Sequence, residues 1–251
     1  MKLTILGSGT YCPEVDRATA GYLLEADGKK IVFDMGRGAL NNLYKAGHKY
    51  SDIDAVAISH MHPDHFNDLT SYLQLLYHPP SEESKRESRV KLIGPEGFKD
   101  NIESLLCSWS KRIDKELVDV KEVLATQEVK LGNLILTAYE TIHSESLQCM
   151  SYRLEVNGKI FSYSGDTTDS WGLRDALRNA DLALVEATMP HSQLKYTHLS
   201  GDLAGKIAQK QGVKRLALTH VKGFYDNAVE EAAQNYSGEI ILAKDLDVID
   251  V

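Results

Sequence analysis

Cysteine is scarce in this sequence of 251 residues, which contains only Cys12, Cys107 and Cys149. The three are far apart, odd in number and without a CxxC pair. They therefore predict neither a disulfide framework nor a zinc knuckle nor a redox motif. We expect all three to be free thiols.

Long apolar runs are also missing. No stretch approaches the ~20 consecutive apolar residues that a membrane span needs. The opening residues Met1–Gly7 read as a strand rather than as the apolar region of a signal peptide. We therefore expect a cytoplasmic protein without membrane contacts.

An excess of positive charge is absent too, and the formal net charge is -8. Binding to nucleic acid usually draws on a basic surface that releases counterions, so RNA is a less favoured partner than a small substrate. The densest basic segment, from Lys85 to Lys91, is interleaved with Glu82, Glu83 and Glu87. Mixed runs of this kind are usually solvated surface, and we expect the same here.

What the sequence does contain is a repeated order of elements, with 43% hydrophobic residues to form a core. In the first half, a hairpin with the turn Asp27–Gly28 ends in an acidic residue and is followed by a helical stretch and an apolar strand. The second half repeats this order around the turn Asn157–Gly158. The expected elements are strands 21–25, 30–34 and 53–58 with helix 39–46, then strands 151–156, 159–163 and 181–185 with helix 173–178.

This repeat predicts one α/β domain over residues 1–251, built as a four-layer αββα sandwich of two facing mixed β-sheets flanked by helices. Asp34 and Asp166 hold equivalent places in the two halves, each at the end of a hairpin. The alternative is that hairpin-plus-helix units recur by chance.

The clearest chemistry lies in the run His60 to His65, which reads HMHPDH and follows the apolar strand 53–58. Three histidines and an aspartate crowded near the core would each cost free energy if they were left unpaired. Metal ions resolve this problem, because imidazole and carboxylate groups are metal ligands. The run therefore predicts a metal site.

The spacing within the run indicates two ions. His60 and His62 project to one side of a loop, while Asp64 and His65 project from the turn that Pro63 enforces. We expect an amphipathic helix over 66–76 directly after the loop.

Two ions need more ligands than one loop supplies. His143, Asp166 and His220 each follow a β-rich run, and α/β folds usually build their sites at the C-terminal ends of strands. Considered alone, each of these three residues could equally be a metal ligand or an ordinary polar residue. Imidazole and carboxylate ligands suit zinc, manganese or iron rather than calcium.

Together these motifs resemble the metallo-β-lactamase-fold hydrolases across nearly the whole chain, and most of all their ribonuclease Z-like branch. The resemblance rests on HMHPDH at His60–His65, His143, SGDT at Ser164–Thr167 and LTH at Leu218–His220. Further support comes from Leu6–Thr10, Leu92–Gly97, Glu186–Thr188 and Thr197–Ser200.

The resemblance implies two divalent metal ions, zinc first and manganese or iron as alternatives, and a homodimer. By this resemblance, the first ion would be held by His60, His62 and His143, and the second ion by Asp64, His65 and His220. Asp166 would bridge the two ions. Ions held in this way would lie about 3.5–4 Å apart and would acidify the water between them into a nucleophilic hydroxide. Asp64 would also orient that water.

The resemblance also implies a proton donor, His198. In the ribonuclease Z-like branch, a histidine from such a loop pairs with the glutamate of an HEAT motif, which VEAT at Val185–Thr188 resembles. Glu186 would hold the imidazole of His198 and raise its pKa, which favours the protonated acid that an alkoxide leaving group needs. The alternatives are that Glu186 only caps backbone groups and that His198 only neighbours a helix cap. Val185 departs from the histidine of the family motif.

One family feature is missing. Members that process transfer RNA carry a long Gly/Pro-rich arm between the third-motif histidine and the aspartate of GDT, whereas only a hairpin separates His143 from Asp166 here. We therefore predict a binuclear metal-dependent phosphodiesterase for a small phosphodiester or nucleotide. The alternatives are a ribonuclease Z-like endonuclease for RNA 3′ ends, a lactam or thioester hydrolase on the same fold, and a non-catalytic metabolite-binding protein.

Overall fold

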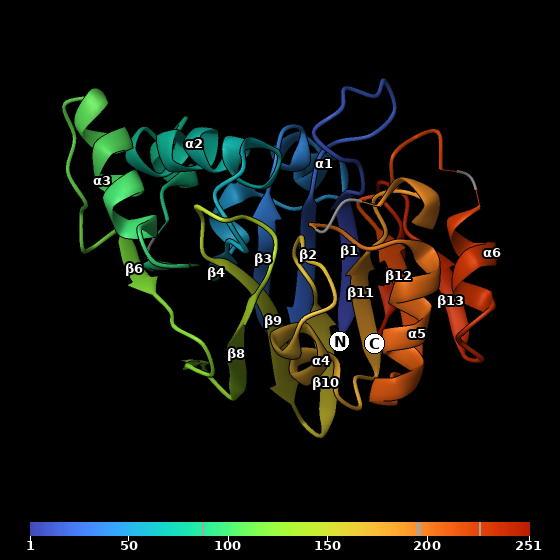
Figure 1. Ribbon diagram of the computed structural model, residues 1–251. Helices are drawn as coiled ribbons and strands as arrows, with labels where there is room; N and C mark the ends of the chain where they lie inside the picture. Colours follow the sequence, from blue (N-terminus) through green and yellow to red (C-terminus); the bar gives the residue numbers. More distant parts are fainter. Residues whose placement is uncertain (87, 195–196, 226) are drawn as a thin grey trace.

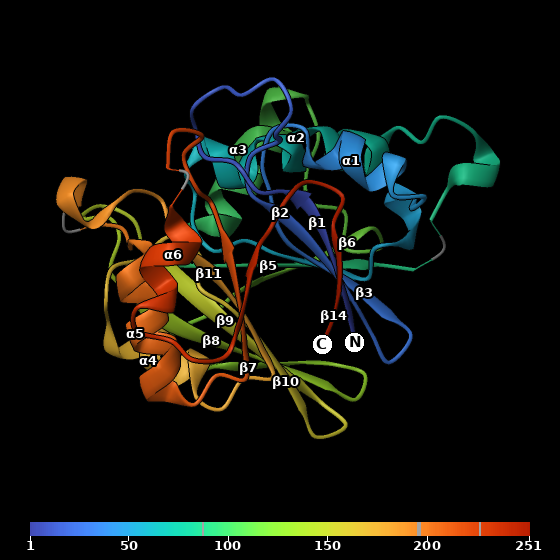
Figure 2. The ribbon, with the colours of Figure 1, turned by 90° about the vertical axis from the view of Figure 1, so that its right-hand side faces the viewer.

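Two β-sheets of seven strands each lie face to face, and helices cover the outer side of each sheet (Figure 1, Figure 2). The computed structural model describes residues 1–86, 88–194, 197–225 and 227–251. The layers run helix, sheet, sheet, helix. The four-layer αββα sandwich that the sequence repeat predicts is therefore confirmed.

The two sheets share one pattern of strand directions. In each sheet, three antiparallel pairings are followed by three parallel pairings. In spatial order the first sheet contains β14 (Val248–Asp250), β1 (Lys2–Gly7), β2 (Gly21–Ala26), β3 (Lys29–Met35), β4 (Ala55–Ala57), β5 (Val90–Gly94) and β6 (Val118–Glu122). The second contains β7 (Glu128–Leu131), β8 (Leu134–Thr141), β9 (Cys149–Val156), β10 (Lys159–Tyr163), β11 (Leu182–Glu186), β12 (Arg215–Thr219) and β13 (Glu239–Leu242).

The last strand crosses back to the first sheet. β14 pairs with β1, so the two chain termini lie side by side (Figure 1). β14 thereby takes the edge position that β7 takes in the second sheet. The repeat in the sequence is thus a repeat of topology that the C-terminal strand completes.

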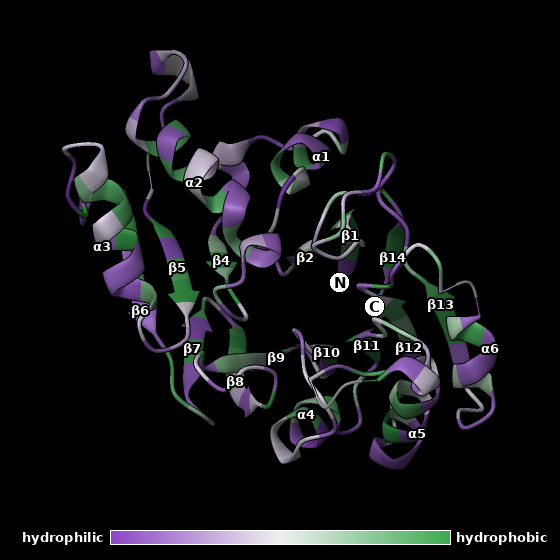
Figure 3. Ribbon diagram, turned by 45° about the horizontal axis from the view of Figure 1, so that its top comes forward, coloured by the Kyte–Doolittle hydropathy of each residue, from purple (hydrophilic) through white to green (hydrophobic). Residues whose placement is uncertain are grey.

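Within the described ranges, three α-helices pack on each sheet. Helices α1 (Ala39–Lys45), α2 (Pro63–Tyr77) and α3 (Phe98–Ser108) cover the first sheet, and α4 (Trp171–Leu177), α5 (Gly201–Gln211) and α6 (Ala228–Ala233) cover the second. Short 3-10 turns lie at Tyr50–Asp52, Glu82–Ser84 and His191–Gln193. Figure 3 shows hydrophilic and hydrophobic segments alternating along these helices, as expected when one helix face is buried and the other is solvated.

The strands alternate their side chains between the two faces of each sheet. In β3, Ile31 and Phe33 point into the core between the sheets, whereas Val32 points into the core beneath the helices. Phe33 meets Phe161 of the second sheet, with ring centroids 5.4 Å apart. This aromatic contact fixes one sheet against the other, and with it the relative positions of the strand ends.

The helix after the metal run differs from the expectation. α2 begins at Pro63, three residues before the expected start at Phe66, so Asp64 and His65 lie in its first turn rather than in a turn that precedes it. Proline suits the first helical position because a backbone N–H there has no acceptor within the helix, so its absence breaks no hydrogen bond. The directions of both side chains are therefore set by helix geometry.

The expectations from composition can also be compared with the structure. Cys12, Cys107 and Cys149 are free thiols, as expected. Lys85 and Arg89 of the mixed charged segment are exposed, and Glu87 lies outside the described residues. Across the described ranges of the chain, none of the helices is both long enough and apolar enough to cross a membrane.

Candidate metal centre

The polar residues singled out in the sequence converge at one end of the sandwich, where strands of both sheets terminate. The segment after β4 and the start of α2 supply candidate ligands from the first half of the fold, and the segments after β8, β10 and β12 supply candidate ligands from the second half. The residues brought together are His60, His62, Asp64, His65, His143, Asp166 and His220. The ends of strands that are far apart in sequence thus build one cluster.

The first group of ligand atoms consists of three imidazole nitrogens. Nδ1 of His62 lies 2.9 Å from Nε2 of His60 and 3.1 Å from Nε2 of His143. A tetrahedral zinc ion with bonds of about 2.0–2.1 Å separates its ligand nitrogens by roughly 3.3–3.4 Å. The three nitrogens are therefore spaced closely enough to share one ion.

The second group combines Asp64, His65 and His220 with one oxygen of Asp166. Nε2 of His220 lies 3.3 Å from Oδ2 of Asp64. Nε2 of His65 lies 3.3 Å from Oδ1 of Asp166. The other oxygen of Asp166, Oδ2, lies 3.8 Å from Nε2 of His143 in the first group. Asp166 thus faces both groups, one oxygen to each, as a bridging carboxylate does.

Two atoms at the heart of the cluster support a bound cation. Nε2 of His65 and Oδ1 of Asp166 are buried, and neither has a hydrogen-bond partner within the described part of the chain. Buried polar atoms are rarely left in this state, because each unsatisfied group costs free energy. A divalent ion would satisfy both atoms, so the residues present fit the metal that the sequence predicts.

Each ligand imidazole except His62 is oriented by a hydrogen bond from its Nδ1. His143 donates to the carbonyl oxygen of Thr197 at 2.7 Å, and His60 donates to Oγ of Ser59 at 3.0 Å. His220 donates to Oγ1 of Thr188 at 2.9 Å. These bonds place the proton on Nδ1 and leave Nε2 as the free lone pair, which is how outer-shell partners usually prepare a metal-binding histidine.

His65 has the strongest of these partners, Asp34. Nδ1 of His65 donates to Oδ2 of Asp34 at 2.6 Å, and both side chains are fully buried. Tyr163 from the second sheet donates to the same oxygen at 2.6 Å. The backbone of Asp34 has a φ of 54°, and a non-glycine residue adopts this left-handed conformation at a cost that surrounding contacts must offset.

From the sequence we assigned no site role to Asp34, although Asp34 and Asp166 occupy equivalent positions in the two halves of the repeat. The signal was present in that equivalence, since both aspartates end a hairpin in matching halves of the fold. In the structure both contact His65, one at each ring nitrogen.

Glu186 and His198 lie beside the cluster as an ion pair. Nδ1 of His198 donates to Oε1 of Glu186 at 2.9 Å. Burial alone lowers the pKa of His198, but the charge and the hydrogen bond of Glu186 outweigh burial and raise the pKa to about 9. The imidazole is therefore protonated at neutral pH, next to a carboxylate that is almost completely buried.

Glu186 also caps backbone groups, which is the alternative role that the sequence left open. It accepts hydrogen bonds from the backbone N–H groups of Thr167 at 2.9 Å and Thr188 at 3.2 Å. The hydroxyl of Thr188 donates to Oε2 of Glu186 at 2.6 Å and accepts from His220. The capping role and the His198 contact coexist, and Thr188 connects the pair to a metal ligand.

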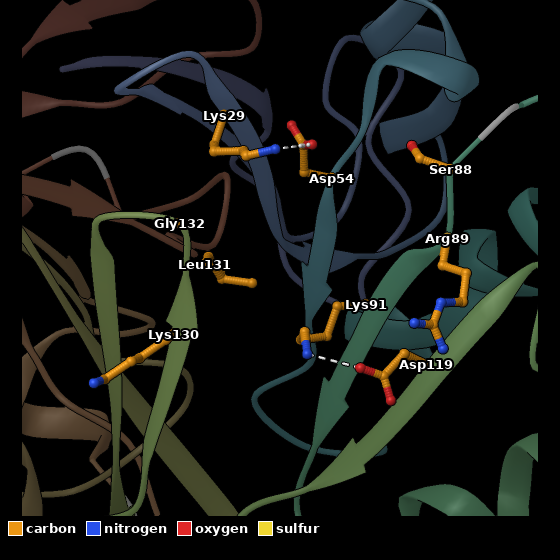
Figure 4. Close-up of a pocket in the computed structure, with 9 residues that line it drawn as sticks. All are labelled: Lys29, Asp54, Ser88, Arg89, Lys91, Asp119, Lys130, Leu131 and Gly132. Atoms are coloured by element: carbon orange, nitrogen blue, oxygen red, sulfur yellow. Dashed lines mark hydrogen bonds and ion pairs between the residues drawn. The ribbon is translucent and has the colours of Figure 1, made fainter.

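A hollow lies at the opposite end of the sandwich from the metal cluster, where strands β3, β5 and β6 begin (Figure 4). It has a volume of about 300 Å³. Its charged lining is largely paired, since Lys29 contacts Asp54 at 2.9 Å and Lys91 contacts Asp119 at 2.7 Å. The described residues of its lining include no histidine. This hollow is therefore not a candidate metal site, unlike the cluster of histidines and aspartates at the opposite end of the sandwich.

One known family model covers most of the chain. The model of the Beta-lactamase superfamily domain matches residues 29–221. That span includes every candidate metal ligand as well as Glu186 and His198.

Individual relatives align over almost the whole chain. The probable metallo-hydrolase YhfI of Bacillus subtilis (strain 168) is 27% identical over 249 residues, which cover 97% of each protein. Ribonuclease Z of Thermobifida fusca (strain YX) is 26% identical over 306 residues, covering 98% of this chain and 93% of that protein. The crystal structure of the metallo-beta-lactamase fold protein YhfI from Bacillus subtilis matches with a TM-score of 0.85 and 25% identity, covering 99% of this chain and 98% of that one.

Proposed function

The chain belongs to the beta-lactamase superfamily of metal-dependent hydrolases, and from this membership we propose that it is a binuclear metal phosphodiesterase acting on a small phosphodiester or nucleotide. The observation that carries the proposal is the contact of 2.9 Å between Glu186 and His198 beside the metal cluster. A protonated imidazole at this place is a proton donor for an oxygen leaving group.

The proposed metal sites follow the geometry. His60, His62 and His143 would hold one ion, Asp64, His65 and His220 the other, and Asp166 would bridge them. When bound, two such ions acidify a water molecule and stabilise the charge that develops on the phosphoryl oxygens. Zinc is the metal that we propose, because nitrogen-rich ligand sets suit it.

The residues of the chain supply the other parts of the reaction. Asp64 borders the cluster through Oδ2 and would orient the attacking water by accepting its hydrogen bond. His198 would give its proton to the departing alkoxide, and Glu186 would hold the imidazole in place and keep it charged. The thiolate of a thioester can leave without a proton donor, whereas an alkoxide needs one, so the pair favours a phosphodiester over a thioester.

The surroundings of the site favour a small substrate. Between His143 and Asp166 the chain forms only the β9–β10 hairpin. The alignment with ribonuclease Z of Thermobifida fusca extends over 306 positions, more than the 251 residues of this chain, so that relative carries segments that are missing here. The net charge of -8 also disfavours a polyanion such as transfer RNA.

A substrate panel tests this proposal. Zinc-loaded protein should hydrolyse bis-p-nitrophenyl phosphate, lose the activity with a chelator and regain it on addition of the metal. The matched control is Asp166→Ala, which should be inactive and deficient in metal. Turnover of a nitrocefin-type lactam or a thioester without any phosphodiester cleavage would favour the lactam or thioester hydrolase. Tight binding of a metabolite without any turnover would favour the binding protein.

A further inference from the structure

We propose that Tyr11, Lys222 and Phe224 form a nucleoside-binding rim at the edge of the metal centre, so that the substrate is a nucleoside phosphate ester. The inference rests on the proposed phosphodiesterase function and narrows its substrate class. Both rings are unusually exposed, Tyr11 at 65% and Phe224 at 61%. The ammonium group of Lys222 lies 5.7 Å from the ring centre of Tyr11 and 6.0 Å from that of Phe224.

The rim is joined to the metal centre through the backbone. Lys222 follows the candidate ligand His220 by two residues, and its N–H donates to the carbonyl oxygen of Thr188. Thr188 in turn contacts both His220 and Glu186 through its hydroxyl. A ligand that reaches Lys222 therefore lies beside two segments, the one after β12 that begins with His220 and the one after β11 that contains Thr188 and His198.

The two loops that make the rim are held together. The loop after β1 lies beside the loop after β12 (Figure 1, Figure 2). Arg17 donates to the carbonyl oxygen of Val221 at 2.8 Å and pairs with Glu14 at 3.3 Å.

The chemistry of the rim matches a nucleoside phosphate better than an apolar partner. Exposed aromatic rings offer faces on which a nucleobase stacks, and this stacking tolerates any base. A lysine between the rings places a positive charge where an apolar partner would have to desolvate it. The same charge attracts a phosphate oxygen that lies beyond the reacting group.

Direct binding tests the rim without any need for catalysis. Calorimetric titrations of the zinc-loaded protein would compare adenosine 5′-monophosphate with ribose 5-phosphate, which lacks the base. We expect the nucleotide to bind roughly tenfold tighter or more, the usual effect of one stacked base. Tyr11→Ala and Phe224→Ala should each remove most of this preference, while Lys222→Gln should weaken both ligands.

Tyr44→Ala is the matched control, because Tyr44 is 46% exposed but lines a separate groove with Gly47 and Pro80. It should leave the preference unchanged. The proposed rim would be contradicted if the wild type bound adenosine 5′-monophosphate and ribose 5-phosphate equally. It would also be contradicted if Tyr11→Ala and Phe224→Ala both kept the wild-type preference for the nucleotide. Failure to cleave any phosphodiester while the preference depends on Tyr11 and Phe224 would overturn the proposed function and leave the rim established.

Discussion

Nδ1 of His65 and Oδ2 of Asp34 lie 2.6 Å apart, although the two residues belong to different elements and neither is exposed to solvent. Asp34 also accepts hydrogen bonds from the backbone N–H of Ser59 at 2.6 Å and from its hydroxyl at 2.7 Å. One buried carboxylate therefore organises two ligand positions, His65 directly and His60 through Ser59.

The first prediction concerns Asp34→Asn. The amide places an N–H₂ group against donors that now face a carboxylate, and it removes the charge that orients His65. We expect the affinity for the second metal ion to fall by roughly 10–100-fold, as for other outer-shell partners. Competition with a chromophoric chelator measures this change. Tyr163→Phe removes one donor but keeps the bond between Asp34 and His65, so it should have a smaller effect. Wild-type affinity for both ions in folded Asp34→Asn would contradict the role.

The second prediction separates proton donation from metal binding. His198→Ala should keep both ions but slow cleavage of a dinucleotide or cyclic nucleotide by roughly 10²–10⁴-fold, because an alkoxide must leave without a proton. Bis-p-nitrophenyl phosphate has a good leaving group and should be cleaved at nearly the wild-type rate. Metal analysis and kcat on the two substrates check this. An equal loss on both would mean that His198 does not act as the acid.

The third prediction concerns pH. The pKa of His198 is raised to about 9, so the acid form is present below that pH and is lost as the pH rises through it. We expect kcat for an alkoxide-leaving substrate to fall above about pH 9. Glu186→Gln removes the larger of the two negative charges that oppose burial and leaves that of Asp166, so the pKa of His198 drops and the alkaline limb moves to lower pH.

The control for this shift is Asp202→Asn, since Asp202 contacts Ser200 and His191 rather than His198. The profile of this variant should match that of the wild type. An alkaline limb that stays in place in Glu186→Gln would show that another group is responsible for it.

The sequence alone predicted those features of the fold that depend on a short, continuous run of residues. The strand expected over 159–163 coincides with β10, Lys159–Tyr163, because the turn at Asn157–Gly158 marks where it begins. The run from His60 to His65 predicted a metal site because the residue types alone are hard to explain otherwise, and the structure gathers these residues in one cluster. The start of α2 was missed because Pro63 was interpreted as the corner of a loop, although proline is equally at home in the first turn of a helix.

Contacts across the sandwich could not be predicted in this way. Tyr163 reaches Asp34 only because the aromatic core sets the distance between the sheets, and the two residues are 129 positions apart in the chain. The return of β14 to pair with β1 likewise depends on where the sheet edges lie. No local pattern encodes such distances, so the contact between Tyr163 and Asp34 and the pairing of β14 with β1 emerged only from the structure.

Gly36 carries the fourth prediction, because it lies where the first sheet meets the start of α2. A Cβ atom at this position would stand 1.9 Å from the carbonyl oxygen of Asp64 and 2.2 Å from Oγ1 of Thr19. The oxygen belongs to backbone, so it cannot move aside as a flexible side chain would. The first turn of α2 would have to shift, and with it Asp64 and His65.

Gly36→Ala should therefore weaken the second metal site selectively and destabilise the fold by about 1–3 kcal/mol, the usual range for overpacking. Native mass spectrometry would show loss of one ion, while the group around His62 keeps the other. Gly28→Ala is the control: its φ of 72° makes alanine strained, but nothing lies within 4 Å of the new Cβ. It should lower the melting temperature without changing metal content. Two ions bound with wild-type affinity in Gly36→Ala would mean that the helix start can shift without disturbing its ligands.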